Sequence, residues 1–240
     1  MKVELAVAII AGVVALVSAA GTIWSSIRNA RHSEAIERLK IEHQVAAQRR
    51  EPDFREPLAR AAYDLQSLLY NILRQNLIDI YLVKGNDREK TYVTNNTTFL
   101  IGQYLCWREI VRREVYFIDL WIDERRDLLG LQDTIDTLWE TDAQPSVLRI
   151  FVGEQRAVGE ALIQTGARGP ECMGYGAFLK SFDKGVNPLI DAIRTDVMSL
   201  DKNLSQAAAR LTNLQNALID LLKMLDPDYL RFPQDRRTKV

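Results

Sequence analysis

The sequence has few of the residues that build common catalytic and metal centres. It contains only two histidines and two cysteines in 240 residues, and no histidine follows His43. This excludes Ser-His-Asp and Cys-His catalysis and the Glu-x-x-His di-iron bundle from most of the chain. The two cysteines, 66 positions apart, provide neither a disulfide framework nor a cysteine-rich zinc site. We therefore expect no enzyme activity, no cofactor and no metal ion.

Glycine, proline and excess charge are also scarce. The 12 glycines and 7 prolines leave little room for low-complexity linkers, and neither a P-loop nor a dinucleotide-binding glycine motif is present. The 31 Lys and Arg residues are balanced by 32 Asp and Glu residues, so the formal net charge is -1. Because no excess of cations is available to displace counterions from phosphates, we expect no nucleic-acid partner.

A long uncharged segment covers residues 5–27. At about 1.5 Å per helical residue, its 23 residues span about 34 Å, enough to cross a hydrocarbon core of about 30 Å. We therefore predict a transmembrane anchor over residues 1–27. Representative positions of the anchor are Leu5, Ile9, Val13, Leu16, Ile23 and Trp24.

Basic residues follow this segment and predict its orientation. Residues 28–52 form a charged helical connector in which Arg28, Arg31, Arg38 and Lys40 lie close to the span. An excess of cations on this side predicts a single-pass membrane protein with its N-terminus outside and the bulk of the chain in the cytoplasm. The alternative is a signal peptide cleaved after Val17-Ser18-Ala19, which leaves an exported helical protein once residues 1–19 are removed.

The remainder is predicted to be an all-α bundle of five to six helices over residues 53–232, followed by a polar tail over 233–240. Apolar residues recur at helical spacing, and no strand of useful length is indicated. Arg108 and Glu109 are expected on the solvent-exposed face of their helix, and Ser146 is a candidate N-cap. The glycine-rich stretch 165–176 is predicted to connect two helices. The expected helices before it cover 57–82, 91–120, 124–140 and 147–164, and a short helix near 177–183 follows it.

The last helix has the strongest pattern. Asn187-Pro188 is a helix start, and apolar residues then alternate at spacings of 4 and 3 over 186–225. This pattern predicts a straight, coiled-coil-like helix of about 39 residues and about 58 Å. Its seam packs either inside the bundle or against a second copy, and Asp196 lies beside it. The candidate interaction seam consists of Ile190, Ile193, Val197, Leu200 and Leu204.

Four charged residues are candidates for a polar pocket inside the bundle. They are Arg112, Glu154, Arg156 and Glu160, of which the last three share the stretch GEQRAVGE with an apolar face. The alternative is that they form a solvated helix face. Cys106 lies on an apolar stripe, which is typical of an inert core thiol.

Four runs of sequence carry a resemblance. They are FREPLARAAYDLQSLLYNIL, WREIVRREV, IFVGEQRAVGE and ALIDLLKMLDP, and they fall within residues 53–230. In these runs the chain resembles a group of bacterial membrane-anchored helical proteins to which no activity is assigned. The resemblance implies a bacterial origin and no function.

Together these features predict a single-pass, membrane-anchored helical adaptor or scaffold. Its expected partners are the lipid bilayer and a protein, or a second copy, bound through helices. The alternative is a ligand-sensing bundle coupled to the membrane segment, because bundles also bind small ligands between their helices.

Overall fold

The computed structural model describes residues 54–114, 122–166, 169–183 and 185–240. Every described residue belongs to one compact unit, Glu51–Val240. The predicted anchor over 1–27 and the connector over 28–52 lie outside the described residues. Within the described part of the chain, no helix combines the length and the apolar character needed to cross a membrane.

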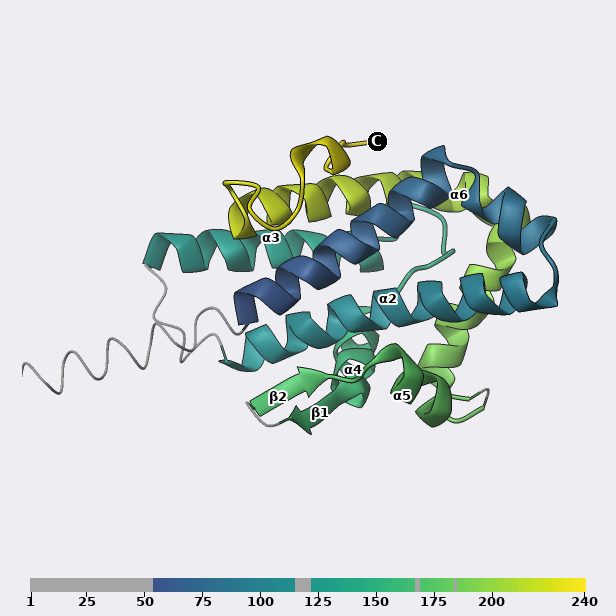
Figure 1. The fold of residues 1–240 in the computed structure, drawn as a ribbon, viewed down its shortest axis with the longest axis horizontal. Coiled ribbons are helices and arrows are strands. Elements are labelled where there is room, and N and C mark those ends of the chain that lie inside the picture. The colour runs from purple at the N-terminus through teal and green to yellow at the C-terminus, as the bar shows by residue number, and fades with distance from the viewer. Residues whose placement is uncertain (1–53, 115–121, 167–168, 184) are drawn as a thin grey trace, which may run out of the picture. The chain divides into compact units, whose positions relative to one another are not determined.

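The described unit is mostly helical, which confirms the predicted all-α class, and it adds one short β-hairpin (Figure 1). A helix over residues 54–74 comes first. The later helices are η1 (Ile78–Val83), α2 (Asp87–Glu114), α3 (Ile122–Glu140), α4 (Val152–Leu162), α5 (Tyr175–Ser181), α6 (Pro188–Leu225) and η3 (Gln234–Arg236). The hairpin consists of the antiparallel strands β1 (Ile163–Gly166) and β2 (Gly169–Cys172).

Helix α2 lies at the centre of the fold. Its sequence carries two adjacent stripes of apolar residues, a pattern that predicts burial over a wide arc. It packs against α4, α6, η1 and the hairpin, and both Tyr104 and Ile110 are fully buried. Gly159 of α4 allows the closest approach, because a Cβ at this position would lie 2.6 Å from the carbonyl oxygen of Leu105. A small residue at this crossing lets the backbones of α2 and α4 come into contact.

Helix α6 begins and ends where the sequence predicts. The Asn187 side chain accepts hydrogen bonds from the backbone N–H groups of Leu189 and Ile190, which otherwise have no partner within the helix. The helix is not straight, however: its two halves run in different directions in Figure 1. Its C-terminal half packs along the 54–74 helix, where Gln215 donates to Gln66 and Arg55 donates to the carbonyl of Leu225.

The candidate interaction seam faces the interior of this unit. Four of its five residues are buried and Leu204 is half-buried, so these side chains pack in the domain's own core. This arrangement corresponds to a seam inside the bundle. The buried seam residues are Ile190, Ile193, Val197 and Leu200.

Two predicted helix boundaries and one predicted connection differ from the structure for identifiable reasons. The helix predicted over 57–82 ends at residue 74, because Asn76 adopts a left-handed φ of 54° before the π-helical turn η1. Asn tolerates this conformation better than most residues. The helix predicted over 147–164 begins only at Val152, and Ser146 does not cap it. The stretch expected to connect two helices contains the hairpin instead.

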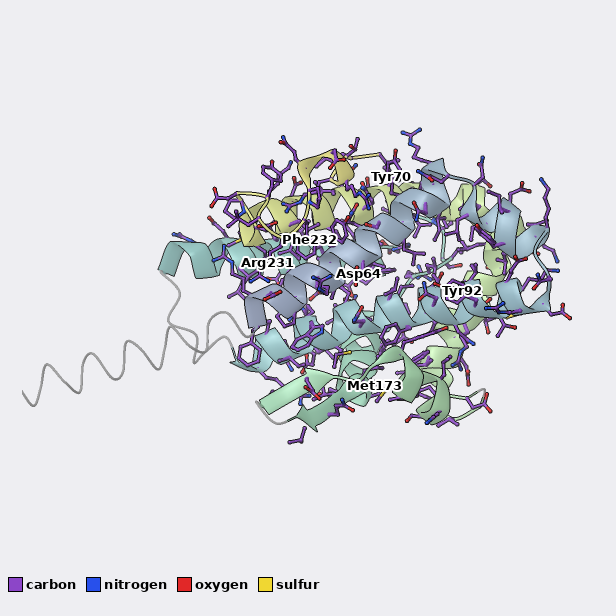
Figure 2. The ribbon with its side chains drawn as sticks, in the orientation of Figure 1. Asp64, Tyr70, Tyr92, Met173, Arg231 and Phe232 are labelled. Carbon is purple, nitrogen blue, oxygen red and sulfur yellow. The ribbon has the colours of Figure 1, made fainter. Side chains whose placement is uncertain are left out.

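The C-terminal segment is packed against the domain, in contrast to the polar tail predicted over 233–240. Phe232 and Arg237 are buried, and the Phe232 ring stacks on Tyr63 of the 54–74 helix at a centroid distance of 4.6 Å (Figure 2). The Asp226 carboxylate accepts hydrogen bonds from the backbone N–H groups of Leu230 and Phe232 and pairs with the Arg237 guanidinium. These contacts hold the segment along the 54–74 helix and α6.

Candidate functional site

The four residues predicted to form one polar pocket are not brought together. Arg112 pairs with Glu109, whose buried carboxylate also pairs with Arg113, and Arg113 in turn contacts the half-exposed Glu160. Arg156 and Glu160 are exposed, Arg112 is half-buried, and Glu154 lines a hollow.

Glu109 was predicted on the solvent-exposed face of its helix, but its side chain is buried. Burial by itself raises the pKa of this carboxyl, but hydrogen bonds from Arg112 and Arg113, at 2.6–2.7 Å, outweigh burial and hold the pKa below its ordinary value. Arg108 is also buried and donates to Asp136 of α3. The ion pairs of Glu109 join successive turns of α2, and the pair of Arg108 with Asp136 joins α2 to α3. Both have a structural role.

The hollow beside Glu154 is the candidate functional site, and we call it the loop pocket. It has a volume of about 290 Å³ and lies between the 146–151 segment, α4 and α6. Its lining consists of Ser146, Arg149, Ile150, Phe151, Glu154, Val158, Leu189, Ala192, Ile193 and Asp196.

A single buried arginine braces the segment that forms one wall. The guanidinium of Arg210 on α6 donates to four backbone carbonyls, those of Leu138, Trp139, Thr141 and Pro145, at 2.7–3.0 Å. The first two belong to the last turn of α3, where carbonyls lack helical partners and the helix dipole favours a cation. Burial lowers the pKa of Arg210, and the charge of Arg149 lowers it further.

The backbone at Leu148 is strained and is held by a carboxylate of the pocket. Leu148 is buried with a φ of 56°, a left-handed conformation that a bulky residue rarely adopts. Its N–H donates to Asp196 Oδ2 at 2.9 Å. Strain of this kind persists only where the surrounding structure enforces it, and it is concentrated at functional sites.

Asp196 is electrostatically perturbed as well. Burial raises the pKa of its carboxyl above the ordinary value, although the Leu148 N–H and the charge of Arg210 act in the opposite direction. A carboxyl with a raised pKa in a hollow is a recognised sign of a functional site. In the loop pocket, the Asp196 carboxyl is therefore best suited to bind a hydrogen-bond donor or a cation.

The rim of the loop pocket carries an exposed aromatic ring. Phe151 is 52% exposed, and the Arg149 guanidinium lies over it at 5.4 Å from the ring centroid. The Phe151 N–H donates to Glu154 Oε2 at 3.0 Å, which fixes both residues at the start of α4. The pocket therefore combines an apolar floor, an aromatic rim and two carboxylates, an arrangement suited to an apolar group that has a cation or donor beside it.

Sequence reasoning named Glu154 as a pocket residue and Ile193 as a seam residue, and it missed most of this site. Arg149, Phe151 and Arg210 are not part of any motif, and Asp196 was recognised only as an acidic neighbour of the seam. The one available signal was an acidic residue beside a buried stripe of α6. The strained conformation of Leu148 and the four acceptors of Arg210 depend on contacts between segments distant in the sequence.

A second hollow, of about 380 Å³, lies between the 54–74 helix and the C-terminal segment. Tyr70, labelled in Figure 2, is part of its lining. The amide of Gln66 in this hollow already donates to Ser67 Oγ and to the Arg236 carbonyl, and its oxygen accepts from Gln215. Because these groups hold the C-terminal segment in place, we assign the candidate site to the loop pocket.

Among the residues that the structure describes, no group of three or more His, Cys, Asp or Glu side chains could hold a metal ion. Comparison of the chain with protein-family models, with curated proteins and with solved structures finds no match. The resemblance to bacterial helical proteins therefore stays a prediction.

Proposed function

We propose that this protein is a single-pass, membrane-anchored helical adaptor whose bundle domain captures a partner protein in the loop pocket. The membrane part of the proposal rests on the uncharged residues 5–27 and on the cations that follow them. The observation that carries the interaction part is the loop pocket, a small hollow with an apolar floor and an exposed aromatic rim. Anchoring confines the partner to the bilayer surface and so raises its local concentration.

The chemistry of the pocket indicates the kind of partner. Ile150, Val158 and Ile193 provide apolar surface for one anchoring side chain, as at the centre of many protein interfaces. Asp196 and Glu154 place negative charge beside it, and Arg149 is engaged with the Phe151 ring. The expected partner segment therefore carries an apolar side chain flanked by Lys or Arg.

A substitution that fills the pocket tests the interaction. Ala192 lines the hollow and is exposed, so Ala192→Trp occupies the space without disturbing the core. Ala209 is exposed on the same helix away from the hollow, so Ala209→Trp is the matched control. A photo-crosslinking benzoylphenylalanine replacing Phe151 reports the partner in cells. We expect crosslinks with wild-type and Ala209→Trp chains and their loss with Ala192→Trp; equal crosslinking of all three would overturn the assignment of the pocket.

Membrane fractionation combined with protease accessibility tests the anchor. A carbonate-resistant membrane fraction with a domain protected in intact cells is the expected result. A soluble chain shortened by about 19 residues and found outside the cytoplasm would instead establish the exported alternative.

A ligand-sensing bundle is the second candidate, because the loop pocket is a real hollow lined by Glu154. Its volume of about 290 Å³ lies at the lower edge of the range of about 300–1,000 Å³ occupied by drug-sized ligands. A single side chain of a partner fits this space better than a ligand of that size. A thermal shift of wild-type protein with a small molecule, lost in Ala192→Trp, would favour the sensing function.

A further inference from the structure

The two cysteines of the chain, 66 positions apart in the sequence, meet in the fold. Cys106 lies in the middle of α2, and Cys172 is the last residue of β2. The crossing of α2 and α4 brings them together. Gly159 of α4 lies against the Leu105 carbonyl, and only four positions later β1 begins at Ile163, the residue that pairs with Cys172.

Two further contacts hold the residues that follow the hairpin against α4 and α2. The Met173 N–H donates to the Leu162 carbonyl at 3.0 Å, which ties the residue after Cys172 to the end of α4. Two helical turns before Cys106, on the same face of α2, the ring of Phe99 packs against Tyr175 of α5 at a centroid distance of 5.2 Å. Between these contacts the Cys106 and Cys172 thiols are neighbours that interact with each other, and Cys106 is fully buried while Cys172 is half-buried.

We propose that Cys106 and Cys172 form a reversible disulfide when the protein meets a hydroperoxide. The half-buried Cys172 is the thiol that solvent reaches. Its sulfur attacks one peroxide oxygen, the O–O bond breaks, and with hydrogen peroxide a sulfenic acid and one water are produced. The Cys106 sulfur then attacks the Cys172 sulfur, the S–O bond breaks, and the hydroxide leaves as water with the Cys106 proton. Two thiols are oxidised and one peroxide is reduced to two waters.

The surroundings of the two thiols give them different roles in this reaction. The neighbouring Cys172 thiol, together with burial, raises the pKa of the Cys106 thiol, so that this thiol stays protonated and does not react with peroxide by itself. Its contact with Cys172 makes it the resolving thiol. Once formed, the bond ties the hairpin covalently to α2 at the end of α4 opposite the loop pocket.

The test uses the purified, reduced, full-length chain treated with hydrogen peroxide. After alkylation of the remaining thiols, intact mass and peptide mapping show whether two hydrogens are lost and whether the peptides containing residues 106 and 172 are linked. We expect loss of both titratable thiols, an intramolecular link, and recovery of both thiols with dithiothreitol. An unmodified chain, a disulfide-linked dimer, or sulfinic acid on Cys172 without a link would each overturn the proposal.

Two variants test separately the roles of Cys172 as the attacked thiol and Cys106 as the resolving thiol. The test of disulfide formation itself does not depend on them. Cys106→Ser leaves Cys172 without a resolving thiol, so peroxide is expected to carry it to sulfinic acid. Cys172→Ser leaves only the buried thiol, which is expected to stay reduced. Rapid oxidation of Cys106 in the Cys172→Ser variant would contradict the assigned order of attack.

Discussion

Replacing Gly159 by alanine tests whether backbone contact between α4 and α2 holds the fold together. The added Cβ would lie 2.6 Å from the Leu105 carbonyl oxygen and 3.0 Å from the Cβ of Glu109. The nearer atom belongs to the backbone of a buried helix, so it cannot rotate away and α4 must move outward. Overpacking of this kind costs about 1–3 kcal/mol, whereas alanine gains only about 0.5–1 kcal/mol over glycine in helix propensity. We expect a net loss of about 1–2 kcal/mol.

Gly130→Ala is the matched control for this variant. Gly130 lies inside α3, and no atom lies within 4 Å of the position that an added Cβ would take. Only the propensity gain therefore applies, and we expect stabilisation by about 0.5–1 kcal/mol. Urea denaturation of both full-length variants, followed by circular dichroism, gives the two free energies of unfolding. Melting temperatures should move in opposite directions, by roughly 2–4 °C for each kcal/mol. A Gly159→Ala chain as stable as Gly130→Ala would refute the role of the close contact.

Three further predictions concern buried polar groups. Arg210→Met removes the donor of four carbonyls and should cost at least about 3 kcal/mol in thermal or urea unfolding, with only partial recovery in Arg210→Lys. Burial raises the pKa of the Asp226 carboxyl, but hydrogen bonds from Phe232, Arg231 and Arg237 outweigh burial and hold this pKa below its ordinary value. The carboxylate therefore stabilises the fold fully above about pH 4. This stabilisation is lost as the pH falls through the lower pKa of the folded state. The stability difference between wild type and Asp226→Asn should therefore shrink on acidification, and a difference that grows would contradict the assignment. Asn187→Ala should cost about 1 kcal/mol and Asn187→Ser much less, as measured by urea midpoints.

Helices whose pattern is local were predictable from the sequence. The bounds of α6 follow from Asn187-Pro188 and the 3-4 spacing, and α3, expected over 124–140, covers Ile122–Glu140. The centre of α2 follows in the same way from its two apolar stripes. Its start was missed by four residues, although Asn86 and Glu89 cap it reciprocally, at 3.1 and 2.8 Å between backbone N–H and side-chain oxygen.

The rest depends on partners far away in the sequence. The 147–151 stretch has helical periodicity, but Asp196 and Arg210 hold that region of the chain in an extended and partly left-handed path. The strands of the hairpin are four residues long, and both contain glycine, so they show no alternation. Arg237 looks like a solvated tail residue until Asp226 and the carbonyls around it are placed beside it. The same cause explains the loop pocket, of which only Glu154 and Ile193 were among the candidate site residues.

The bracing by Arg210 also determines when the loop pocket comes into existence. Arg210 follows the carbonyls it binds by 65 to 72 positions, and Asp196 follows Leu148 by 48. Because a chain is synthesised from its N-terminus, the 141–151 stretch emerges long before the two side chains that shape it. Until α6 docks, its carbonyls are solvated and its path is not fixed. The partner binding that we propose would thereby be conditional on completion of the domain, and an unfinished chain would not compete with finished copies for the partner.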